Sequence, residues 1–149
     1  MNSTRSFKWF GFLALAVLAA YLSPASRGAE PVFKGRFTLP FETRWGTAVL
    51  PAGNYSFTMQ SATDSSLIAV RDEQARPVMI TSSYGVSEGK ASDGSHLIVL
   101  RSGRRGSVRA LYLEELGMTF YYPVPKADKQ LVAQAPQLIQ RLPVLAAGK

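Results

Sequence analysis

The stretch NYSFTMQ, residues 54–60, alternates polar and apolar side chains without interruption. Tyr55, Phe57 and Met59 occupy every second position, and successive side chains of a β-strand point to opposite faces of a sheet. One face of this segment is therefore predicted to join a core while the other meets water. Residues 36–42 alternate in the same way, which predicts a second strand of the same kind.

Further short runs rich in β-branched and other apolar residues predict more strands downstream. These runs are residues 67–70, 78–81, 97–100, 108–113 and 118–122. Side chains at the apolar positions of the alternating runs are expected to form the core. The expected core residues are Phe37, Leu39, Phe41, Tyr55, Phe57, Val99, Leu111 and Phe120.

Turn-forming segments separate the predicted strands. They are residues 51–53, 72–77, 85–94, 102–106 and 114–117. In the first of them, Pro51 presets φ and Gly53 is expected to supply a positive φ. The segment 85–94 is expected to be a long loop, and the other links are short enough for antiparallel hairpins. The predicted fold class is all-β, an antiparallel meander barrel or sandwich of about seven to nine strands.

The C-terminal tail, residues 124–149, is predicted to be partly irregular or helical. Asp128 is a suitable cap for a short helix over residues 129–135, which Pro136 would end. Residues 137–145 are apolar enough to return as a last strand. An alternative remains open here, because Leu131, Ala135, Leu138 and Leu142 also fit a helical stripe.

The N-terminus has the layout of a secretory signal peptide. Arg5 and Lys8 precede an uninterrupted apolar or small run at residues 10–22, and Pro24 then breaks the segment. The run is shorter than the roughly 20 residues of a membrane-spanning helix, so no stable transmembrane span is expected after cleavage. An uncleaved membrane anchor is the alternative.

Cleavage is predicted after Ala25 or Gly28, where small residues stand at the recognition positions. This divides the chain into a signal peptide, residues 1–28, and a single β domain, residues 29–149. The domain of about 120 residues is long enough to bury one core.

Composition narrows the class of protein further. Of the 149 residues, 46% are hydrophobic and 18% charged, which is typical of a globular chain. The formal net charge is +7, and removal of the signal peptide lowers it. The chain has no cysteine, which excludes disulfides and thiolate chemistry. Exported eukaryotic domains of this size often depend on disulfides, so we expect a bacterial protein in the periplasm or outside the cell.

A family resemblance supports this expectation. The segment FTLPF at residues 37–41, Gly46, and LPAGNYSF at residues 50–57 resemble the start of a family of small uncharacterised secreted bacterial β proteins. Members of that family open with a V-P-F strand followed by L-P-A-G-x-Y, several hairpins and a polar C-terminal stretch. The resemblance implies a secreted β fold and brings no activity, cofactor or site residues.

No catalytic, cofactor-binding or metal site is predicted. His96 is the only histidine, and Ser95 beside it would point to the opposite face of a strand. Glu114 and Glu115 are sequential rather than opposed across a cleft, as a glycosidase would need. The acids of residues 72–73 and 93 lack the alternating pattern of a calcium loop.

One surface feature favours binding. Arg101, Arg104, Arg105 and Arg109 flank the tip of a predicted hairpin, and no acid follows until Glu114. Such a cluster either keeps a turn solvated or binds anions, such as anionic envelope polymers or an acidic protein. Nucleic acid is not expected, because the chain is exported and the patch lacks interleaved aromatic residues.

These observations predict a non-enzymatic secreted or periplasmic β-domain protein that binds anionic envelope components. The alternative is a small barrel that carries an apolar ligand. The aromatic residues expected to line such a cavity are Trp45, Tyr84, Tyr112, Tyr121 and Tyr122. An enzyme of unknown type is the third and least favoured interpretation, because a nucleophile, base and metal set is missing.

Overall fold

The computed structural model describes residues 31–62, 66–89, 94–124 and 138–147. Within them lie eleven β-strands and one short 3-10 helix, η1 (Glu114–Leu116). The strands are β1 (Phe33–Leu39), β2 (Thr43–Trp45), β3 (Ala48–Leu50), β4 (Gly53–Met59), β5 (Leu67–Asp72), β6 (Pro77–Ser82), β7 (Gly85–Glu88), β8 (His96–Ser102), β9 (Arg105–Leu113), β10 (Met118–Tyr121) and β11 (Leu138–Ala146).

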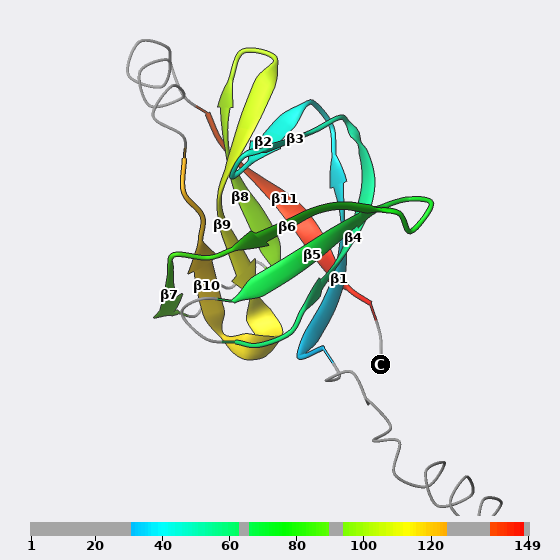
Figure 1. Ribbon diagram of the computed structural model, residues 1–149. Coiled ribbons are helices and arrows are strands. Elements are labelled where there is room, and N and C mark those ends of the chain that lie inside the picture. The colour runs from blue at the N-terminus through cyan, green and yellow to red at the C-terminus, as the bar shows by residue number, and fades with distance from the viewer. Residues whose placement is uncertain (1–30, 63–65, 90–93, 125–137, 148–149) are drawn as a thin grey trace, which may run out of the picture.

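The chain is an all-β protein with a nearly closed, barrel-shaped sheet (Figure 1). The order along the sheet is β3-β2-β9-β8-β11-β1-β4-β5-β6, with β10 pairing with β9 and β7. β3 and β6 are the two ends of this order and do not pair with each other. The β2–β3 turn lies beside β6, since a Cβ built on Gly46 would lie 3.3 Å from Thr81 Oγ1. After β6 the chain crosses to β10, where the Tyr84 amide donates a hydrogen bond to the Tyr121 carbonyl at 2.9 Å.

Alternation of side chains forms the core as the sequence predicts. Strand β1 is buried at every second residue, and β4 follows the same pattern opposite it, with Phe37 paired with Tyr55. All of the expected core residues are buried except Phe41, which is half-buried. The reason is that β1 ends at Leu39, so the alternation no longer governs the direction of the Phe41 side chain.

Strand β11 confirms the predicted return of residues 137–145 and joins the two halves of the sheet. It pairs with β8 over Leu138–Pro143 and with β1 from Val144 onward. Pro143 has no amide hydrogen to donate, and it stands where the strand changes neighbours. Leu138 and Leu142 therefore belong to a strand. The predicted helix over residues 129–135 lies outside the described residues.

Two local expectations are wrong. Part of the expected loop 85–94 is strand β7, because β10 provides a backbone partner and Val86 packs against the core. Gly53 does not have a positive φ but begins β4 in extended conformation. The sheet is also more than a series of hairpins, because β2 pairs with β9 in parallel and β1 lies between β11 and β4.

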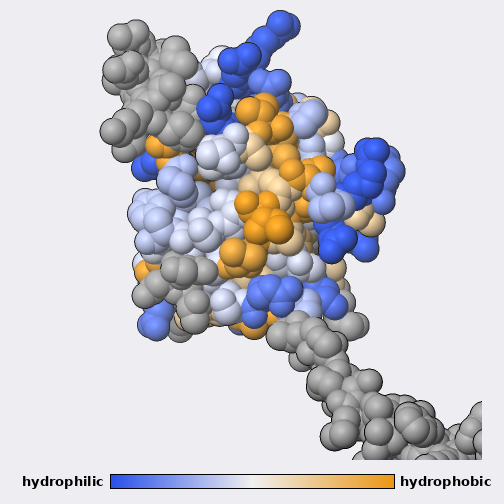
Figure 2. All heavy atoms as spheres, in the orientation of Figure 1, coloured by the Kyte–Doolittle hydropathy of each residue, from blue (hydrophilic) through white to orange (hydrophobic). Residues whose placement is uncertain are grey.

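Apolar residues also gather on the surface. Figure 2 shows an apolar band near the middle of the face that β6 crosses in Figure 1. Strand β6 carries exposed Val78 and Ile80, and the neighbouring β5 carries exposed Leu67.

Candidate functional site

The predicted arginine hairpin exists as the connection between β8 and β9. Ser102 pairs with Arg105, so only Gly103 and Arg104 lie between the strands. Gly103 has a φ of +60°, the left-handed conformation that two-residue hairpin turns favour and that glycine adopts without strain. The turn therefore projects Arg104 into solvent, where its side chain is exposed.

Arg101, on the last part of β8, is held in place from two sides. Its guanidinium carbon lies 4.9 Å from the centroid of the Phe41 ring, within the range of a cation–π contact. Its Nε donates a hydrogen bond to the carbonyl of Gly103 at 3.0 Å. These two contacts orient the charged group toward the corner between β1 and β2.

A groove of about 430 Å³ lies at this corner. Its lining residues are Pro40, Phe41, Glu42, Arg101, Arg104 and Gln140. They come from the β1–β2 corner, the hairpin tip and the first part of β11. The groove therefore combines an apolar wall, two guanidinium groups and a side-chain amide within a volume suited to a small ligand or one unit of a polymer.

The corner and the hairpin are fixed to each other by the backbone. The amide of Gly106 donates to the carbonyl of Glu42 at 2.9 Å. A Cβ on Gly106 would lie only 2.5 Å from Phe41 Cε2, so glycine is what permits this approach. The close packing brings Phe41 and Glu42 to the tip, although they lie far from it in the sequence.

Arg105 has an acidic partner that the sequence did not reveal. Its Nε lies 3.1 Å from Glu42 Oε1, and both side chains are substantially exposed. The expectation that no acid stands near the tip before Glu114 is therefore wrong, because an acid from the β1–β2 corner reaches it. In contrast, Arg104 makes no hydrogen bond or ion pair with any described residue.

Arg109 does not line this groove. It lies four residues beyond Arg105 on β9, roughly 13 Å along an extended strand. It stands at the register shift opposite Ile98 and Val99, and its carbonyl accepts the amide of Tyr122 at 2.9 Å. The structure thus brings Arg101 and Arg104 together, places Arg105 against Glu42, and separates Arg109 from the other three.

Ser95 and His96 have separate hydrogen-bond partners. Ser95 Oγ donates to Glu115 Oε2 and accepts the amide of Glu114, both at 2.8 Å. His96 Nδ1 lies 2.7 Å from the carbonyl of Gly94. The Ser95 hydroxyl therefore bonds both the first backbone amide of η1 and the Glu115 carboxylate, which ties η1 to the residue before β8.

The aromatic residues considered for a ligand cavity are divided among three places. Trp45 and Tyr122 are fully buried in the core, while Tyr84 is 65% exposed. Tyr121 is at the surface, with its hydroxyl 3.0 Å from Ser87 Oγ. Tyr112 packs against His96, with ring centroids 5.3 Å apart. They do not line one common cavity.

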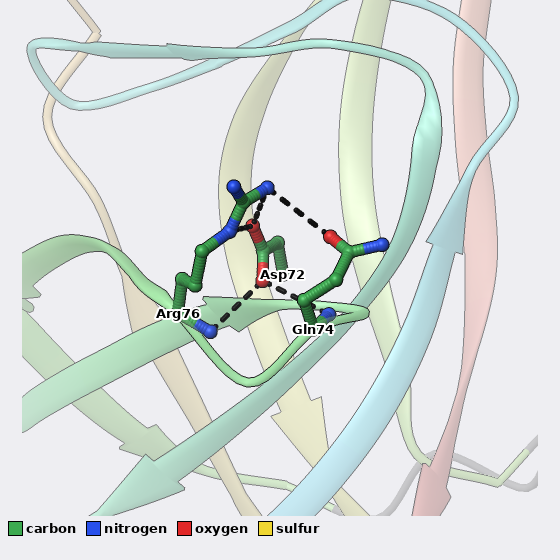
Figure 3. Close-up of polar contacts among 3 residues, drawn as sticks. All are labelled: Asp72, Gln74 and Arg76. Atoms are coloured by element: carbon green, nitrogen blue, oxygen red, sulfur yellow. Dashed lines mark hydrogen bonds and ion pairs between the residues drawn. The ribbon is translucent and has the colours of Figure 1, made fainter.

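A second groove, of about 670 Å³, lies over the outer faces of β11, β1 and β4 beside the β5–β6 turn. The turn is held by Asp72, as Figure 3 shows. Asp72 Oδ1 accepts the amides of Gln74 and Arg76 at 3.0 and 2.9 Å, and Oδ2 accepts Arg76 Nε at 2.7 Å. Both carboxylate oxygens are therefore engaged within the turn.

The charge of this carboxylate is stabilised by the same contacts. Desolvation raises the pKa of Asp72, but the hydrogen bonds and positive charge of Arg76 and the amide of Gln74 outweigh it, so the pKa lies below its ordinary value. In the described part of the chain, no three histidine, aspartate or glutamate side chains are grouped as metal ligands.

Comparison with known proteins gives no relative: no protein-family model, curated protein or solved structure matches the chain significantly. The resemblance of residues 37–57 to a secreted bacterial family therefore stays a prediction. Across the described ranges, no helix has the length and apolarity to cross a membrane. The predicted signal peptide lies outside these ranges.

Proposed function

We propose that this chain is a non-enzymatic extracytoplasmic bacterial protein whose β8–β9 tip binds anionic polymers of the cell envelope. One observation carries the proposal: Arg101 and Arg104 line the same groove, and the acid that also lines it, Glu42, is paired with Arg105. The tip therefore keeps positive charge that the described residues do not neutralise.

The chemistry of the groove supports an acidic polysaccharide as the ligand. A guanidinium group offers a planar pair of donors that matches a carboxylate or phosphate. Pro40 and Phe41 offer an apolar wall for a sugar ring, and the Gln140 amide can bond a hydroxyl group. Because the groove is open to water, its charges are screened over a Debye length of about 8 to 10 Å at physiological salt. Binding should therefore weaken as the salt concentration rises.

The interior of the barrel supports this surface role over the alternative of an apolar-ligand carrier. Trp45, Phe57, Phe120 and Tyr122 are each no more than 1% exposed and fill the core. A small barrel whose interior is occupied by side chains leaves little room for a ligand. The separate hydrogen-bond partners of Ser95 and His96 likewise support a non-enzymatic role.

The test is retention of the protein on immobilised polygalacturonate, a carboxylated polysaccharide, at low and physiological salt. The double variant Arg101→Gln, Arg104→Gln should elute at clearly lower salt than the parent. The matched control is Arg36→Gln, Arg71→Gln, which removes the same charge from exposed positions on β1 and β5.

The control separates a site from general charge attraction. If both double variants lose retention equally, binding reflects only net charge and the proposed site is wrong. If the tip variant is retained as well as the parent while its circular dichroism is unchanged, the arginines serve only to solvate the turn.

A further inference from the structure

Two polar side chains meet inside the barrel core. Trp45, at the end of β2, and Tyr122, just after β10, are both completely buried. Their ring centroids are 5.2 Å apart and the ring planes are inclined by 82°, so the edge of one ring faces the other. The fold thus brings together the indole from the end of β2 and the phenol from the residue that follows β10.

Among the described residues, neither polar atom of this pair, Trp45 Nε1 or Tyr122 OH, has a hydrogen-bond partner. Buried polar groups in native proteins are nearly always hydrogen-bonded, because a lost partner costs the desolvation energy of the group. Burial raises the pKa of Tyr122, so the phenol is neutral and its oxygen can both donate and accept.

We propose that a water molecule inside the barrel joins the two groups, accepting the Trp45 Nε1 hydrogen and bonding the Tyr122 hydroxyl. Water is the smallest molecule that can satisfy a donor-only indole and a donor-acceptor phenol together, and buried waters typically make about three hydrogen bonds. The surrounding core is apolar, including Phe37 at 5.7 Å from the Trp45 ring, which disfavours a charged ligand.

A contact between the indole N–H and the Tyr122 ring face is the competing explanation. The inclined ring arrangement is compatible with it, but such contacts are weak. It would also serve only Trp45 and leave the Tyr122 hydroxyl without a partner. The two explanations therefore predict different consequences of removing the hydroxyl.

Tyr122→Phe removes that hydroxyl while keeping the ring. If it bonds a water, the variant should raise the unfolding equilibrium constant in denaturant melts by about fivefold, the effect of one lost hydrogen bond. If the hydroxyl has no partner, the variant should be as stable as the parent or more stable, because a buried unpaired group disappears. That outcome would overturn the proposal. Tyr84→Phe, at an exposed position, is the matched control and should change nothing.

Nuclear magnetic resonance of the full chain gives a direct readout. The chain has two tryptophans, Trp9 and Trp45, so a Trp9→Phe variant assigns the indole signals. The Trp45 Nε1 hydrogen should show a cross-peak to a long-lived water, and this cross-peak should weaken in Tyr122→Phe. Its absence in the parent protein, or crystallographic density between the two atoms that is larger than one water, would contradict the proposal.

Discussion

Arg105 Nε lies 3.1 Å from Glu42 Oε1, an ion pair that links the tip of the β8–β9 hairpin to the corner between β1 and β2. The pair lies at the surface, so its contribution to stability is small, about 0.2 to 1 kcal/mol at most. Its larger effect is on charge. Glu42 neutralises one arginine of the tip and leaves Arg101 and Arg104 facing the groove.

Replacing Glu42 by glutamine should therefore strengthen anion binding. Glu42→Gln removes the carboxylate that neutralises Arg105, so three arginines of the tip can then attract an anion. We expect elution from polygalacturonate at higher salt than for the parent, with a steeper salt dependence.

The control for this change is Glu73→Gln, which removes one negative charge from an exposed residue of the β5–β6 turn. Equal strengthening by both variants would show that net charge alone determines retention. Weaker retention of Glu42→Gln would contradict the role assigned to the tip.

Asp72 should make the stability of the protein depend on pH. Because its pKa is lower in the folded protein, the ionised carboxylate stabilises the fold above its unfolded pKa of about 3.9. This contribution is lost as the pH falls through the lower, folded pKa. Asp72→Asn should thus lower the Tm at pH 7 and approach the parent in strong acid.

Thermal melts of parent and variant between neutral pH and about pH 2 check this expectation. Glu73→Gln serves as the control, because Glu73 makes no hydrogen bond or ion pair with the described residues. A Tm difference for Asp72→Asn that stays constant over the whole range would show that the charge of Asp72 is not the cause.

Ala75, in the same turn, adopts a φ of +62°, which is unfavourable for a residue with a Cβ. Hydrogen bonds around it hold this conformation, including that from its amide to the Asp72 carbonyl at 2.9 Å. Ala75→Gly should remove the strain and stabilise the fold by up to about 1 kcal/mol in denaturant melts. In contrast, Ala69→Gly within β5 should destabilise it by about 0.5 to 1 kcal/mol. If Ala75→Gly and Ala69→Gly lower the stability equally, the backbone at Ala75 is not strained.

The sequence was sufficient to predict the features that depend on local pattern. Alternation places Tyr55 and Phe57 on the core face because strand geometry alone sets which way a side chain points. The glycine at position 103 likewise identifies a tight turn, since its conformational freedom is a local property.

Features that depend on distant neighbours were not predictable. Strand β11 pairs with β8 and then with β1. The periodicity of the sequence does not indicate which strands β11 will pair with. Residues 85–88 contain a glycine and few apolar side chains, yet β10 makes them a strand by supplying backbone partners.

The candidate site also combines residues that the local sequence identifies with residues that only the folded chain brings to it. The tip arginines are visible as a cluster in the sequence, but Phe41, Glu42 and Gln140 reach them only through the packing of the β1–β2 corner and β11. The alternating pattern even assigned Phe41 to the core. Because β1 ends before it, the ring is only half-buried: it packs against the edge of the core and also contacts the Arg101 guanidinium.

The core face of β4 can be tested at Phe57, which is 1% exposed. Its ring stacks on Phe33 with centroids 5.8 Å apart and lies 6.1 Å from the Phe37 ring. Phe57→Ala should remove this packing, leave a cavity that the rigid sheet cannot close, and cost about 3 to 5 kcal/mol in denaturant melts. Leu145→Ala is the control, because Leu145 is 70% exposed and its loss should cost less than about 0.5 kcal/mol. A loss below about 0.5 kcal/mol for Phe57→Ala would mean that this aromatic cluster does not support the barrel.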